Sequence, residues 1–201
     1  MSQVWLITDA ARGLGRTLAE AVLRAGRRVI AGARDPGRLA ALAARHATHM
    51  RAVGVDLADE ASIYAAVDEA LTAFGRIDVV VGLDGGADAA ADVEMDDAAL
   101  RAQLETDFFG SAALAHAVLP VLREQRGGRF VQILADHAAD SAARRAAQAA
   151  LRSYLEALAA TAARDGVDID VVDPGAMLAQ TIGRNASSAR VLRFAARPEA
   201  A

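Results

Sequence analysis

Among the acidic residues and histidines of this sequence, four are candidates for acid and base catalysis, namely Asp84, Asp107, Asp136 and His137. Asp136 and His137 are adjacent and follow an apolar stretch that ends at Leu134. A carboxylate beside an imidazole can transfer protons in an enolisation, a dehydration or a ring closure without a cofactor. We therefore predict that these four residues form a catalytic site, the alternative being that they are solvated loop residues.

The framework that positions these residues is an alternation of short apolar runs and amphipathic helices. The apolar run Val4–Ile7 enters a glycine-containing turn, and the helix after the turn ends at Gly26. This alternation predicts one domain, residues 1–201, built as a doubly wound parallel sheet. The further strands are predicted at 29–33, 51–55, 77–81, 129–134 and 167–172, and the further helices at 35–47, 59–75, 97–125 and 141–164.

Parallel strands all end at the same edge of a sheet, and sites in such proteins lie at that carboxyl edge. We expect the four acid–base residues there, together with Asp140. The helix 97–125 contains Pro120, which is predicted to kink its last third. Val191–Phe194 is a candidate for a short seventh strand.

Composition limits the classes of partner. The 201 residues carry a formal net charge of −4 and show no basic clusters. The sequence therefore does not indicate a binding surface for nucleic acid or for an anionic membrane. The sequence has no cysteine and no lysine, and no ligand spacing that specifies a metal site, so none is predicted. No apolar run approaches the roughly 20 residues that cross a bilayer. We expect a cytoplasmic protein whose partners are a small-molecule ligand or substrate and other protein chains.

The stretch from Thr8 to Gly15, which reads Thr-Asp-Ala-Ala-Arg-Gly-Leu-Gly, resembles the Thr-Gly-x-x-x-Gly-x-Gly motif of short-chain dehydrogenases/reductases (SDR). The resemblance extends nearly to Gly175 and implies a Rossmann-like fold with strand order 3-2-1-4-5-6. It also implies a shortened C-terminal substrate segment, because relatives usually carry a longer one. One departure is immediate, since Asp9 stands where the family has its first glycine.

The resemblance also allows the catalytic positions of the family to be compared with this sequence. Gly82–Gly85 matches the family's Asn-Asn-Ala-Gly and keeps only the last glycine, while Asp107 matches its catalytic asparagine. Ala135 matches its serine, and Arg144 and Gln148 match its tyrosine and lysine. The resemblance thus implies that the nicotinamide-dependent oxidoreductase apparatus has been lost.

Cofactor binding is a separate question. Asp9 and Asp84 are expected near the pyrophosphate, where a carboxylate about 4 Å from a phosphate charge costs about 4 kcal/mol at an effective dielectric constant near 20. We therefore expect no cofactor, or NADP(H) if any is bound. The positions that match the family's NADP-binding residues are Arg12, Gly13, Gly15, Arg34 and Asp56.

Three functions remain open. The first is a cofactor-independent isomerase, cyclase or lyase that acts on a small organic metabolite. The second is a noncatalytic pseudo-SDR that binds a ligand or another subunit, and the third is an NADP(H)-dependent oxidoreductase. Because SDR relatives dimerise through the corresponding helices, we expect a homodimer through 97–125 and 141–164, or a heteromer with an active SDR. Arg144 and Arg145 are expected to be solvated residues of a first helical turn, the alternative being that they bind a carboxylate or phosphate of a substrate. His116 is expected to be a packed or interface residue.

Overall fold

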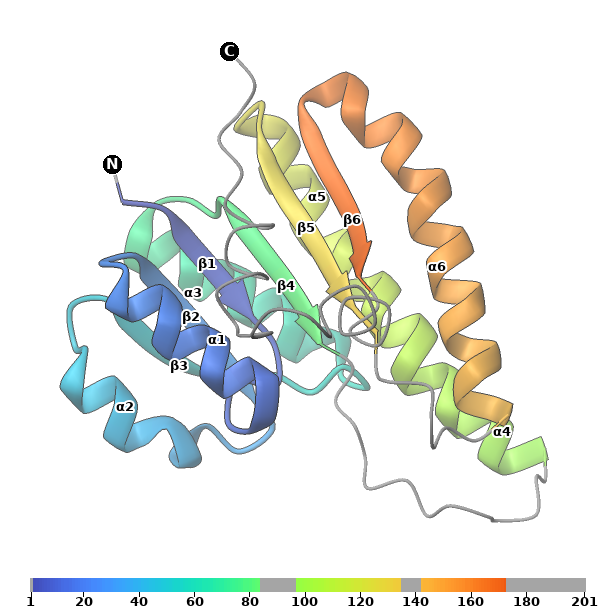
Figure 1. Cartoon of the computed structure of the whole chain (residues 1–201), viewed down its shortest axis with the longest axis horizontal. Coiled ribbons are helices and arrows are strands. Elements are labelled where there is room, and N and C mark those ends of the chain that lie inside the picture. The colour runs from blue at the N-terminus through green and yellow to red at the C-terminus, as the bar shows by residue number, and fades with distance from the viewer. Residues whose placement is uncertain (1, 84–96, 135–141, 173–201) are drawn as a thin grey trace, which may run out of the picture.

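A six-stranded parallel sheet forms the centre of the computed structural model, which describes residues 2–83, 97–134 and 142–172 (Figure 1). The strand order is β3-β2-β1-β4-β5-β6, and all five pairings are parallel. The predicted fold class and strand order are therefore confirmed. The strands are β1 (Val4–Ile7), β2 (Arg28–Ala33), β3 (Met50–Gly54), β4 (Val79–Leu83), β5 (Gly128–Ile133) and β6 (Val167–Val172).

Helices cover both faces of the sheet, as the alternation of strands and helices requires (Figure 1). Buried residues of α1 and the segment through α2 pack on one face, while those of α3, α5 and α6 pack on the other. Among the described residues, no helix is long and apolar enough to span a membrane. The helices are α1 (Gly13–Arg24), α2 (Ala40–Arg45), α3 (Glu60–Phe74), α4 (Asp97–Leu104), α5 (Ser111–Glu124) and α6 (Ala142–Ala162), with short 3-10 turns at Pro36–Leu39 and Ala163–Asp165.

The helix ends follow the capping residues of the sequence. Asp35 and Asp59 each accept a hydrogen bond from the backbone N–H two residues later, at 3.0 and 3.1 Å. Gly75 and Gly166 end their helices in the left-handed conformation, both with φ of 77°. Glycine adopts this conformation without steric cost, so the predicted ends of these helices are confirmed.

The long helix predicted at 97–125 is not a single α-helix. A π-helical turn, η2 (Glu105–Gly110), separates α4 from α5, and α5 continues through Pro120. The irregularity therefore lies well before the predicted kink. At Gly110 the turn packs closely against Leu57 of the loop after β3, because a Cβ added to this glycine would lie 2.7 Å from the Cβ of Leu57. The predicted strand Val191–Phe194 lies outside the described residues.

The ends of β1 and β4 are joined by a buried threonine. The hydroxyl of Thr8 accepts a hydrogen bond from the N–H of Leu83 at 2.8 Å and lies 3.2 Å from the carbonyl oxygen of the same residue. The chain order reverses between these two strands, since β1 leads to β2 on one side and β4 leads to β5 on the other. Ligands of open parallel sheets bind at such a switch point.

Candidate functional site

The turn between β1 and α1 forms the first part of the candidate site. Asp9 occupies the left-handed region with φ of 44°, which aspartate tolerates better than most residues. Gly13 opens α1 with φ of 48°. A Cβ at Gly15 would lie 2.9 Å from the carbonyl carbon of Asp9, so only glycine allows the helix to start this close to the turn. The turn thus keeps the tight shape of a phosphate-binding loop while its first glycine position carries a carboxylate.

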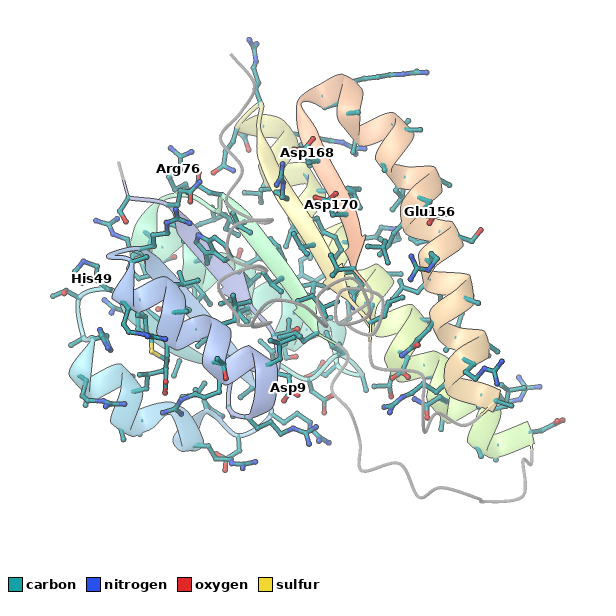
Figure 2. The ribbon with its side chains drawn as sticks, in the orientation of Figure 1. Asp9, His49, Arg76, Glu156, Asp168 and Asp170 are labelled. Atoms are coloured by element: carbon teal, nitrogen blue, oxygen red, sulfur yellow. The ribbon has the colours of Figure 1, made fainter. Side chains whose placement is uncertain are left out.

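The carboxylate of Asp9 interacts with the guanidinium group of Arg12. The Nε atom of Arg12 lies 3.3 Å from one carboxylate oxygen of Asp9 and 3.4 Å from the other. Figure 2 shows Asp9 near the first turn of α1, at the end of the sheet where β1 and β4 terminate. A pyrophosphate at this helix start would meet a negative charge that already engages Arg12. This end of the site therefore fits a dinucleotide poorly.

The other two predicted cofactor residues lie at the ends of neighbouring strands. Arg34 directly follows β2 and Asp56 lies two residues after β3, and both side chains are exposed. Asp56 accepts a hydrogen bond from the N–H of Ala58 at 3.0 Å, and its own N–H donates to the hydroxyl of Ser62 at 2.9 Å. The turn after β3 is therefore held in one shape, with an exposed carboxylate and an exposed guanidinium near it. These residues are compatible with the adenosine end of a dinucleotide.

A buried ion pair between Asp107 and Arg144 forms the second part of the candidate site. The Nε atom of Arg144 donates to a carboxylate oxygen of Asp107 at 3.2 Å, and the two side chains are 7% and 1% exposed. The side-chain amide of Gln103 donates to the same carboxylate oxygen. The expectation that Arg144 is solvated is therefore wrong, because the first turn of α6 packs on η2. Arg145, the next residue, is exposed as expected.

The pair determines what this part of the site can do. A guanidinium group keeps its proton in proteins, so Arg144 can bind a negative charge but cannot act as a proton donor. Its partner Asp107 is held as the acceptor of two side-chain hydrogen bonds. Gln148, one turn further along α6, is also buried and carries no charge. The described residues here supply charge pairing and hydrogen bonding.

Only one of the four predicted catalytic residues is described by the structure. Asp107 is in the ion pair, while Asp84, Asp136 and His137 lie outside the described residues, as does Asp140. The predicted cluster at the carboxyl edge therefore stays a prediction. No group of three or more potential metal ligands occurs among the residues that the structure describes.

Sequence reasoning did not predict that Asp107 and Arg144 form a pair. They are 37 positions apart, so no local pattern links them. A signal was nevertheless present. The SDR resemblance places positions 107 and 144 in one catalytic group, and this sequence has an acidic residue at the first and a basic residue at the second. Two unusual charges of opposite sign at positions known to face one another predict an ion pair.

An aromatic cluster on η2, α5 and α6 was also not predicted. The Nε2 atom of His116 lies 2.5 Å from the hydroxyl of Tyr154, which joins α5 to α6. Phe108 makes edge-to-face contacts with Tyr154 and with Phe109, at ring-centroid distances of 5.9 and 5.0 Å. Phe109 is 54% exposed, so the cluster has a solvent-facing apolar surface. His116 is exposed on α5 and contacts Tyr154 of α6 within the same chain, and its place at a subunit interface stays a prediction.

Comparison with known proteins gives consistent matches. The family described as short chain dehydrogenase matches residues 3–189. Oxidoreductase BOA17 of Botryotinia fuckeliana is 36% identical over 182 residues, which cover 87% of this chain and 66% of that protein. Dehydrogenase/reductase SDR family member 7B of Bos taurus is 31% identical over 186 residues, which cover 86% and 57% respectively. The chain therefore spans less than two thirds of the length of these two relatives.

Solved structures show the same fold. A short-chain dehydrogenase from Streptomyces avermitilis is 33% identical, with a TM-score of 0.72, and the match covers 86% of this chain and 65% of that one. A metagenomic short-chain oxidoreductase in complex with NADP is 23% identical, with a TM-score of 0.77, and the match covers 98% and 93%.

Proposed function

We infer the function of this chain from the family to which it belongs, the short-chain dehydrogenases/reductases. We propose that it is a noncatalytic member which no longer transfers hydride and which associates with another subunit through α5 and α6. The observation that carries the proposal is the buried pair of Asp107 and Arg144. By the resemblance, these residues stand where the family has its catalytic asparagine and tyrosine.

The chemistry of the substituted residues supports this loss. Carbonyl reduction requires a proton donor near the reacting oxygen, and a guanidinium group does not release its proton at physiological pH. The family's lysine corresponds to the neutral amide of Gln148, and the sequence contains no lysine that could replace it. Ala135, which matches the family's serine, has no hydroxyl group.

The proposal includes weak or absent binding of NADP(H). The negative charge of Asp9 beside the start of α1 would repel a bound pyrophosphate. The residues Gly13, Gly15, Arg34 and Asp56 could still hold the rest of a dinucleotide. Isothermal titration of the protein with NADPH and with NADP tests this point. A submicromolar dissociation constant would contradict it.

The second candidate function is NADP(H)-dependent oxidoreductase activity. It is favoured by the relative named as an oxidoreductase, which is 36% identical to this chain. An assay of NADPH consumption distinguishes the two candidates. The protein is incubated with NADPH and a panel of aldehydes and ketones, and the absorbance of the reduced nicotinamide is followed. Turnover by the wild-type protein above the rate without protein would support the oxidoreductase and refute the noncatalytic proposal. We expect no turnover above the rate without protein.

Cofactor-independent acid–base catalysis stays a prediction that the described residues leave untested. Of its four residues, Asp107 is engaged with Arg144, and its remaining candidates include the adjacent Asp136 and His137. The substitutions Asp136→Asn and His137→Ala test it once a substrate or ligand is known. Unchanged turnover and binding in both folded variants would leave the noncatalytic proposal as the better one.

Association with another subunit is supported by the aromatic cluster around Phe109. The only large apolar side chains exposed on the described part of the surface are Phe109 and Tyr64, at 54% and 46%. Phe109 adjoins α5, whereas Tyr64 belongs to α3. We expect light scattering to show a dimer that Phe109→Ser weakens and Tyr64→Ser leaves intact. A monomer at high concentration would contradict this part of the proposal.

A further inference from the structure

The amino ends of the strands carry arginines that the fold brings to one edge of the sheet. β2 begins at Arg28, Arg51 is the second residue of β3, and Arg129 is the second residue of β5. Arg76 lies between α3 and β4, and Figure 2 shows it at the end of the sheet opposite to Asp9. These arginines are far apart in the sequence, so only the fold gathers them at this edge.

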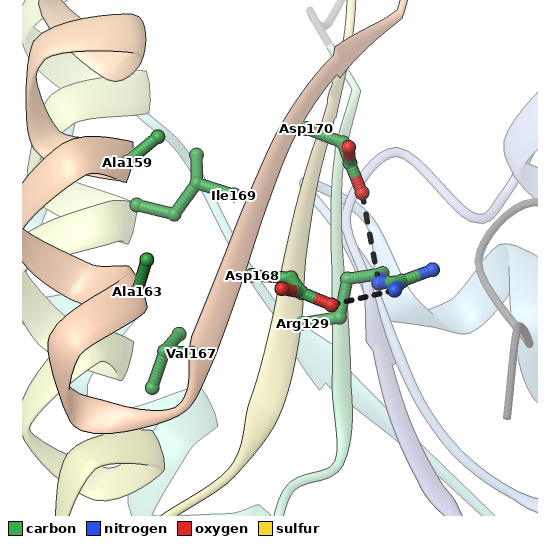
Figure 3. A pocket seen from close by; sticks show the side chains of 7 residues that line it. All are labelled: Arg129, Ala159, Ala163, Val167, Asp168, Ile169 and Asp170. Carbon is green, nitrogen blue, oxygen red and sulfur yellow. Dashed lines mark hydrogen bonds and ion pairs between the residues drawn. The ribbon is translucent and has the colours of Figure 1, made fainter. Parts of the chain in front are cut away.

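Two of these arginines are paired with carboxylates. The Nε atom of Arg76 donates to a carboxylate oxygen of Asp78 at 2.9 Å. Arg129 lies 2.6 Å from a carboxylate oxygen of Asp168 and 3.6 Å from one of Asp170, in a groove beside β6 (Figure 3). The charges of Arg76 and Arg129 are therefore compensated within the chain.

Arg28 and Arg51 differ, because both guanidinium groups lie over the ring of Phe74. Their Cζ atoms are 5.4 and 5.6 Å from the centroid of this ring. Arg51 pairs in register with Ile30, two residues after Arg28, so both arginines project from the face of the sheet that α3 covers. Phe74 is the last residue of α3 and packs against the core on that face. One ring therefore holds two positive charges close to each other.

The negative charge around this pair is smaller than its positive charge. A carboxylate oxygen of Glu69 lies 3.9 Å from the Nε atom of Arg51, and both side chains are 41% exposed, so this contact contributes little. Among the residues that the structure describes, none forms a hydrogen bond or an ion pair with the guanidinium group of Arg28. The carbonyl end of α3 adds only about half a negative charge. The two arginines on Phe74 therefore keep an excess of positive charge.

Both guanidinium groups are held in position without a ligand. The Nη1 atom of Arg51 donates to the carbonyl oxygens of Ala47 and Met50, at 2.6 and 2.9 Å. Arg28 rests on the half-buried ring of Phe74. Both arginines are only half-buried, so a ligand in solvent can reach them. Because the side chains are already ordered, binding an anion costs them less conformational entropy.

We propose that Arg28 and Arg51 bind the phosphate group of a small phosphorylated ligand. A guanidinium group presents its N–H donors in a planar fork that matches the oxygens of a phosphate. A phosphate monoester carries a charge of about −1.5 to −2 at neutral pH, which two guanidinium groups balance better than a single carboxylate does. The site lies at the opposite edge of the sheet from the turn before α1, so it does not depend on the noncatalytic proposal.

Titration of the full-length protein with methyl phosphate, a simple phosphate monoester, tests the proposal. The Nε–Hε signals of the arginines are followed by proton–nitrogen correlation NMR at constant ionic strength and about pH 8, where the monoester is a dianion. Signals that are missing from the spectra of Arg28→Gln and Arg51→Gln identify the two side chains. We expect both signals to shift and saturate with methyl phosphate, and acetate to bind at least about fivefold more weakly.

The same variants measure how much each arginine contributes. Arg28→Gln and Arg51→Gln should each weaken the binding of methyl phosphate about tenfold or more. Arg28→Lys keeps the charge but loses the planar fork, so we expect a smaller loss of about threefold. Arg123→Gln is the matched control, because Arg123 lies at the same edge and pairs with Asp165, and it should leave the dissociation constant unchanged.

Three results would overturn the proposal. The first is an unchanged affinity in Arg28→Gln, or in Arg28→Lys if the glutamine variant does not fold. The second is equal binding of methyl phosphate and acetate, which would indicate a general attraction of anions. The third is binding that Arg12→Gln abolishes and Arg28→Gln leaves intact, which would place the phosphate at the turn before α1.

Discussion

Removing one partner of the buried ion pair should strongly destabilise the protein. In Arg144→Gln the carboxylate of Asp107 stays buried, with a side-chain exposure of 1%, and loses its guanidinium partner. Breaking a buried pair in this way typically costs 3–5 kcal/mol. The amide of Gln103 still donates to Asp107, so we take the lower end, about 3 kcal/mol. A loss of about 3 kcal/mol lowers the folding equilibrium constant about a hundredfold and lowers Tm by roughly 6–12 °C for a chain of this size.

The assay is equilibrium unfolding in urea for the wild type, Arg144→Gln, Asp107→Asn and the double variant. Trp5 is the only tryptophan of the sequence and is fully buried, so its fluorescence reports loss of the sheet. The double variant buries two neutral amides, and we expect it to be more stable than the sum of the single effects predicts. The coupling free energy should be about 2 kcal/mol or more.

The exposed pair of Arg123 and Asp165 gives a matched control. Its atoms are 3.0 Å apart, but the side chains are 40% and 47% exposed. Arg123→Gln and Asp165→Asn should therefore show a coupling of about 0.2–1 kcal/mol. If Arg144→Gln costs less than about 1 kcal/mol, or if the two pairs couple equally, burial does not set the strength of the pair and the reasoning fails.

Three further outcomes follow from individual residues. Asp9→Gly should strengthen NADPH binding at least about tenfold in calorimetry by removing charge beside the pyrophosphate, and unchanged affinity would refute this account of the turn. Gly110→Ala should lower the free energy of unfolding in urea by about 1–3 kcal/mol, because η2 must move away from the loop after β3. Gly54→Ala is the control, since a Cβ there meets nothing within 4 Å, and it should lower this free energy by less than about 1 kcal/mol. The pKa of Glu20 lies below its usual 4.5, chiefly because Arg16 donates a hydrogen bond to it, so its ionised form favours the folded state above that pH. The small Tm difference between the wild type and Glu20→Gln should therefore shrink as the pH falls through and below 4.5, and a difference that grew in acid would contradict the sign.

The sequence alone determined the architecture, because local chemistry fixes where strands and helices begin and end. The apolar runs of β1 and β4 are typical of strands buried on both faces, and both strands are buried throughout. Asp35, Asp59 and Gly75 stop or start helices through hydrogen bonds and backbone conformations that involve only neighbouring residues. Boundaries shifted by one or two residues, as at β3 and β4, because the pairing of neighbouring strands decides the last residues of each.

The tertiary structure decided the features that depend on contacts between distant segments. The irregular turn η2 packs at Gly110 against Leu57, a contact between distant segments that no helical pattern contains. The pairing of Asp107 with Arg144 likewise requires α6 to lie across η2, and it changes an arginine expected in solvent into a buried charge. The sequence gives the type of each side chain. Whether that side chain is solvated or paired depends on which surface the fold places against it.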